Sequence, residues 1–106
     1  MWVHPLKNHT LIKNKLLEAI SKVPKFSLTE HENNKISHTD FYLSASVKRD
    51  YLDIFYDNIK QHMLMLCENF HSKNWRIHSS WFQQYHQGDT HGWHNHGESQ
   101  FAGVYY

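Results

Sequence analysis

The feature that most constrains the fold is a long apolar stripe in the middle of the chain. Its residues recur at steps of three or four and are Leu52, Phe55, Ile59, Met63, Leu66 and Phe70. This spacing is that of one face of an α-helix, and a helix of about 20 residues is roughly 30 Å long. The pattern therefore predicts a helix over about 50–71. Ordinary core packing, rather than a soft-metal lining, is the expected role of its methionines.

A shorter apolar stripe lies nearer the start of the chain. Ile12, Leu16 and Ile20 share one face at four-residue spacing, so a helix is predicted over about 8–23. Pro24 ends this helix because proline disfavours helical geometry in the residue before it. We expect the helix to lie as a pad on a sheet.

Strand patterns occur in four segments. From Phe41 to Lys48 apolar and polar residues alternate, which is typical of a strand with one buried face. The predicted strands cover about 39–48, 75–86, 90–96 and 100–106, with turn signals at 87–89 and 96–99. The polar run His31–His38 is predicted to be a loop. The expected architecture is a single α+β domain over 1–106, with a mainly β core and two supporting helices.

The composition narrows the classes of partner and compartment. The chain has 106 residues and 40% hydrophobic content, which fits one folded domain and argues against disorder. Its formal net charge is +1 and its basic residues are scattered, so no nucleic-acid partner is expected. The single cysteine, Cys67, excludes an internal disulfide and suits a reducing compartment. The opening residues lack a signal-peptide core, and no apolar run approaches the roughly 18 residues of a membrane span. A cytoplasmic location is expected.

Histidine is unusually frequent, and four of the eleven histidines lie between Trp81 and Tyr106. His94 and His96 are two residues apart, so on an extended strand both imidazoles point to the same face. Neutral imidazole suits Fe, Zn, Ni and Cu(II), but a catalytic centre usually takes three protein ligands. Glu98 shares the parity of the two histidines but lies in a turn. His91 has the opposite parity unless a bulge changes it, and a plain surface position for these histidines is the alternative.

The last third of the chain resembles a known family. The residues that carry the resemblance are Trp81, Phe82, Tyr85, Gly88-Asp89, His94-Asn95-His96, Ser99 and Gly103-Val104-Tyr105-Tyr106, with Thr39-Asp40-Phe41 and the long helix upstream. This pattern is similar to that of prolyl-hydroxylase-like, 2-oxoglutarate-dependent Fe(II) oxygenases common in phage and marine bacterial genomes. The resemblance implies a double-stranded β-helix, a jelly roll of about eight strands, of which this chain is the N-terminal part. For a phage protein the expected location is the host cytoplasm.

The resemblance also implies a site. The family holds Fe(II) with two histidines and a carboxylate, leaving positions for 2-oxoglutarate and O₂. His94 matches the first metal ligand, whereas His96 stands where the wider superfamily usually has Asp or Glu. Either His96 replaces that carboxylate or Glu98 supplies it. Tyr85 and Tyr106 match the tyrosines that contact 2-oxoglutarate, and core packing is the alternative role for both.

Two further comparisons leave the function open. Gly88, followed after five residues by His94-Asn95-His96, also fits the opening motif of cupins, which hold other divalent metals without 2-oxoglutarate. The oxygenase family continues past the pair Tyr105-Tyr106, where its distal histidine and a basic residue for 2-oxoglutarate lie. We therefore expect a C-terminally truncated module, inactive alone unless a second chain completes the barrel. No catalytic residue is assigned and the substrate is open. A non-enzymatic fragment or interaction partner is the third alternative.

Overall fold

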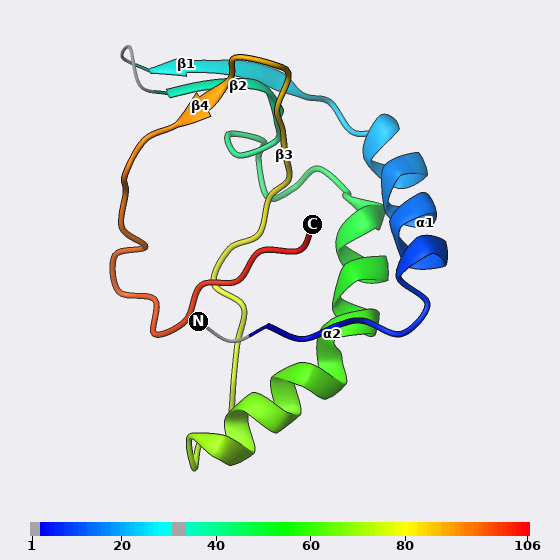
Figure 1. Cartoon of the computed structure of the whole chain (residues 1–106), viewed down its shortest axis with the longest axis vertical. Helices are drawn as coiled ribbons and strands as arrows, with labels where there is room; N and C mark the ends of the chain where they lie inside the picture. Colours follow the sequence, from blue (N-terminus) through cyan, green and yellow to red (C-terminus); the bar gives the residue numbers. More distant parts are fainter. Residues whose placement is uncertain (1–2, 31–33) are drawn as a thin grey trace.

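The computed structural model describes residues 3–30 and 34–106 (Figure 1). Its elements are α1 (His9–Ser21), β1 (Phe26–Glu30), β2 (Asn34–Thr39), α2 (Asp50–Asn69), β3 (Gln83–Gln84) and β4 (Thr90–His91). The two helices lie side by side, and the sheet crosses one end of the molecule (Figure 1). The described part of the chain is therefore α+β. None of its helices has the length and apolar character needed to cross a membrane.

Strand β2 organises the sheet. It pairs antiparallel with β1 on one edge and with both β3 and β4 on the other. Its Ile36 lies opposite Leu28 of β1 and is only 1% exposed. The register shifts between Phe26 and Leu28, as it does at a β-bulge. The resulting sheet is four-stranded, antiparallel and open within the described residues.

The main core lies between the helices rather than inside a β-barrel. Its buried members are Ile12, Leu16, Val23, Tyr51 and Phe82. Ile12 and Leu16 come from α1, and Tyr51 comes from the first turn of α2. Phe82, the residue just before β3, adds a side chain from the C-terminal part of the chain. The expectation of a mainly β core is not confirmed, because the buried cluster of the described residues comes mainly from α1 and the start of α2, with Leu52 and Phe55 of the α2 stripe packed on it and only partly buried.

A buried aspartate joins the sheet to α2. Asp40 is 0% exposed, and its Oδ1 accepts a 2.9 Å hydrogen bond from the backbone N–H of Phe82. Its Oδ2 accepts a 2.6 Å bond from the Tyr51 hydroxyl and lies 3.4 Å from Arg49 Nη1. Thr39 Oγ1 donates to the carbonyl of Phe82 at 2.8 Å. Both backbone polar groups of Phe82 are thus held. Burial, followed by the hydrogen bond to Asp40, raises the pKa of Tyr51 above its usual range.

Both helices were predicted correctly. The helix expected over 8–23 spans His9–Ser21, and the helix expected over 50–71 spans Asp50–Asn69. Helical periodicity is a local property, because every intrahelical hydrogen bond joins residues four apart. The sequence therefore carried enough information to find them.

The strand predictions around β2 are wrong. The segment predicted as a strand over 39–48 begins at the last residue of β2 and continues as turns, closed by hydrogen bonds from Leu43 N to Asp40 O and from Val47 N to Ser44 O. The loop predicted over His31–His38 contains most of β2, while its residues 31–33 lie outside the described part. β1 was not predicted. Polar residues form a strand here because pairing on both edges satisfies the backbone, whatever the side-chain pattern.

The C-terminal strands are much shorter than predicted. Of the strand predicted over 75–86, only Gln83–Gln84 pairs with β2. Of the strand predicted over 90–96, only Thr90–His91 does, and the segment predicted over 100–106 contains no strand. β2 is six residues long, so its one edge has room for two short partners. Residues 100–106 lie against the helices instead, where Tyr105 hydrogen-bonds His9 Nδ1 at 2.9 Å and Phe101 contacts Phe70. The turns expected at 87–89 and 96–99 are present, with positive φ at Gly88 and Gly97.

Candidate functional site

The turn between β3 and β4 is held by Asp89. The Asp89 side chain is 1% exposed and accepts hydrogen bonds from the N–H and hydroxyl of Ser37 and, at 2.8 Å, from the N–H of His86. Lys35 Nζ lies 3.4 Å from its Oδ1. The hydrogen bonds from Ser37 and His86 lower the pKa of Asp89 to about 2. The carboxylate thereby ties β4 to β2 and sets where the next segment starts.

This anchor predicts an acid-dependent loss of stability. The pKa of Asp89 falls from 3.8 to about 2 on folding, so its contribution is fully present above pH 3.8 and is lost as pH falls through about 2. Urea unfolding of the wild type and of an Asp89→Asn variant, measured across this range, should show a stability gap that narrows as pH falls. A gap of constant size down to pH 2 contradicts the assignment.

Three histidines gather where the chain leaves β4. The ring centroids of His91 and His94 are 4.1 Å apart with an interplanar angle of 16°, so the two imidazoles are stacked. The rings of His94 and His96 are 4.9 Å apart at 72°. All three side chains are exposed, on the extended segment that runs along one side of the molecule (Figure 1). The structure therefore brings His94 and His96 together, as their spacing suggested, and adds His91.

The hydrogen bonds determine the tautomers of two of these rings. His94 Nδ1 lies 3.0 Å from the carbonyl of Gly92, which can only accept, so Nδ1 carries the proton. The Tyr85 hydroxyl donates its single proton to Gln83 Oε1 at 2.7 Å. His91 Nδ1, which lies 3.3 Å from the same hydroxyl oxygen, is therefore the donor of that contact. In the neutral form of each ring, Nε2 is therefore the nitrogen without a proton.

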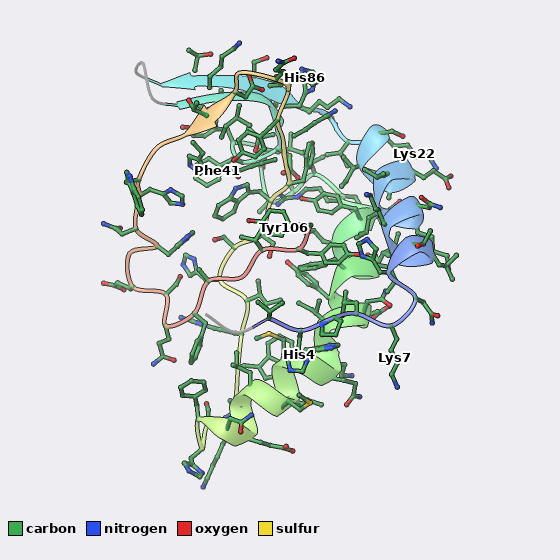
Figure 2. All side chains as sticks on the ribbon, in the orientation of Figure 1. His4, Lys7, Lys22, Phe41, His86 and Tyr106 are labelled. Atoms are coloured by element: carbon green, nitrogen blue, oxygen red, sulfur yellow. The ribbon has the colours of Figure 1, made fainter. Side chains whose placement is uncertain are left out.

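Electrostatic interactions link the tyrosines to the same region. Burial raises the pKa of Tyr85, and the nearby Tyr106 and Asp89 raise it further. Tyr106 is 92% exposed, and Figure 2 shows it near the middle of the view, away from His86 at the outer end of the sheet. Burial, followed by the neighbouring His94 and His96, lowers the pKa of His91. Tyr85, His91 and the His94–His96 pair thus form one continuous set of contacts.

The donor types suit a divalent transition metal, but the geometry is not that of a completed site. Within residues 3–30 and 34–106, no three His, Cys, Asp or Glu side chains are arranged to hold one ion. Glu98 lies exposed in the turn closed by the hydrogen bond from Ser99 N to His96 O at 3.1 Å. Neutral imidazoles with free Nε2 atoms fit iron, zinc or cobalt by their chemistry.

Sequence reasoning assigned no role to His91. Its strand parity is opposite to that of His94; a bulge at Gly92 was weighed as the feature that could reverse this parity, but His91 was not among the predicted ligands. Comparisons of the chain with protein-family models, with curated proteins and with solved structures find no match.

Proposed function

We propose that this chain carries the metal-binding and cosubstrate-binding part of a 2-oxoglutarate-dependent Fe(II) oxygenase. The single observation that carries the proposal is the state of His94. Its Nδ1–H is held by the Gly92 carbonyl, so Nε2 carries the lone pair of the neutral ring, and the ring contacts His96. Metal-binding histidines characteristically donate their second N–H to a carbonyl or carboxylate in this way. In such a site, Fe(II) with 2-oxoglutarate and O₂ supplies the oxidative chemistry that hydroxylates a C–H bond.

Each of the four proposed site residues has a defined task in this proposal. His94 and His96 donate nitrogen lone pairs to the metal. Tyr106 and Tyr85 donate hydrogen bonds to a carboxylate of 2-oxoglutarate, and the 92% exposure of Tyr106 leaves its hydroxyl accessible. The Tyr85 O–H would exchange its acceptor, from Gln83 Oε1 to the cosubstrate carboxylate, and its oxygen would still accept the hydrogen bond from His91. The proposal places the rest of the barrel, including a basic residue for the far carboxylate of 2-oxoglutarate, outside residues 1–106.

Calorimetric titration of the purified chain with Fe(II) under anaerobic conditions tests the proposal. We expect His94→Ala to weaken Fe(II) binding roughly 100-fold, since the loss of a ligand should match or exceed the loss of a supporting residue. We expect 2-oxoglutarate to tighten Fe(II) binding to the wild-type chain. The matched control is His71→Asn at the end of α2, because His71 has φ 52 and asparagine tolerates this conformation. Equal Fe(II) affinity in the wild type and His94→Ala contradicts the proposal.

One observation favours a second candidate. The cluster contains three imidazoles, and in the described chain no carboxylate joins two of them in a three-ligand group. An all-nitrogen set is closer to a cupin-like metal protein that does not use 2-oxoglutarate. Tight metal binding that depends on His94 but does not respond to 2-oxoglutarate would select this candidate.

A further inference from the structure

We infer that His91 is a third protein ligand of the metal site, oriented by the Tyr85 hydroxyl. The inference rests on the proposed metal site at His94 and His96, and it names the ligand that two histidines leave missing. A catalytic metal centre typically has three protein ligands and keeps further positions open. A third imidazole from within the segment would complete that number without Glu98.

The fold determines where His91 stands. It is the last residue of β4, and the backbone of β4 is fixed by pairing with Asn34 and Lys35 of β2. The Asp89 side chain holds the turn just before β4. His91 is therefore the member of the cluster that is anchored to the sheet, whereas His94 and His96 follow on an exposed segment without regular structure.

The hydrogen bonds around Tyr85 prepare His91 for coordination. The Tyr85 O–H donates its hydrogen bond to Gln83, so the Tyr85 oxygen accepts a hydrogen bond from the Nδ1–H of His91. Nε2 of the neutral His91 ring then carries the lone pair. An outer partner that fixes the tautomer and ring orientation is a general feature of metal-binding histidines. A surface histidine that binds no metal does not need its ring oriented by hydrogen bonds that run from Gln83 through the Tyr85 hydroxyl to His91.

The stacked rings require one movement. Nearly parallel imidazoles, at 16°, do not direct their Nε2 lone pairs to one point. Coordination therefore requires one of the two stacked rings to tilt about its side-chain bonds, and for His94 the tilt has to keep its Nδ1–H on the Gly92 carbonyl. His94 is exposed, and its ring is hydrogen-bonded to the Gly92 carbonyl. Such rotations of exposed side chains take picoseconds to nanoseconds, so the fold does not have to rearrange.

Cobalt(II) titration of the 106-residue chain tests the inference. The metal affinity is measured by calorimetry and the coordination by the visible absorption of Co(II). We expect His91→Ala to weaken Co(II) binding roughly 100-fold, as for His94→Ala, and to change the absorption band of the residual complex. We expect about a tenfold loss for Tyr85→Phe, which keeps the ring but removes the acceptor that orients His91. His71→Asn should bind Co(II) like the wild type.

The outcomes separate this inference from the proposed function. If His94→Ala weakens Co(II) binding and His91→Ala does not, the inference is overturned and the proposed metal site stands. If neither change alters the affinity, both are overturned. A measurement without substitution removes the question of folding: ¹⁵N spectra of the wild-type histidines should show His91 as the Nδ1–H tautomer, with its Nε2 signal shifting on addition of Zn(II). An Nε2 signal of His91 that stays in place while His94 shifts overturns the inference.

Discussion

Replacing Asp40 with alanine is expected to lower the free energy of unfolding by about 3–5 kcal/mol, the loss typical of removing one member of a buried charged pair. Asp40 is fully buried and binds Tyr51, Arg49 and the N–H of Phe82. Its removal leaves a buried N–H without an acceptor and a guanidinium, with 15% side-chain exposure, without its carboxylate. Small domains are stable by only about 5–15 kcal/mol, so the variant should be close to unfolding. Urea unfolding followed by circular dichroism measures the change.

A milder variant separates the carboxylate from its individual contacts. Tyr51→Phe removes one hydrogen bond to Asp40 and retains the aromatic ring that packs on Phe82. We expect it to lower the free energy of unfolding by about 1.5–3 kcal/mol, the usual range for a hydrogen bond to a charged group. If Asp40→Ala is no more destabilising than Tyr51→Phe, Asp40 is not the residue that joins the sheet to α2.

Phe82→Ala is expected to lower the free energy of unfolding by a similar amount, about 3–5 kcal/mol, because it opens a cavity in the core. The Phe82 ring is 9% exposed and lies 5.8 Å from the ring of Tyr51. It is the core residue that attaches the segment before β3 to both helices. The loss should appear as a lower urea midpoint with both helices melting in the same transition.

The chain offers a matched control for this cavity. Phe101, like Phe82, contacts another aromatic ring, since its ring centroid lies 4.9 Å from that of Phe70. Unlike Phe82, it is 50% exposed. Phe101→Ala should destabilise by about 1 kcal/mol or less, since the site leaves little cavity. Similar losses in the two variants would mean that the core is not centred on Phe82 and the helices.

Two segments show why strands were harder to predict than helices. Residues 41–48 alternate as a strand should, yet the backbone turns there, with Thr39 Oγ1 accepting the N–H of Phe41 and Asp40 drawn into the core. Residues 34–39 look polar, yet they form the central strand because β1, β3 and β4 supply their hydrogen-bond partners. A strand depends on partners that are distant in the sequence, so its own pattern is weak evidence.

The candidate site divides in the same way. The residue types and spacing of His94, His96, Tyr85 and Tyr106 could be selected from the sequence. The position of His91 in the cluster could be raised from the sequence only as a possibility, because it depends on where β4 ends and on the Tyr85 hydroxyl from the other side of the turn at Asp89. Tautomers likewise follow from partners that only folding brings together.

The sequence by itself determined the two helices, the turns at Gly88 and Gly97, and which side chains could bind a metal. Helical periodicity, the conformational freedom of glycine and the chemistry of imidazole all act over a few neighbouring residues. The tertiary structure alone decided that β2 is the centre of the sheet, that Asp40 is its link to α2, and that His91 stacks on His94. The first two depend on contacts whose partners lie elsewhere in the fold, and the third depends on where pairing with β2 ends β4.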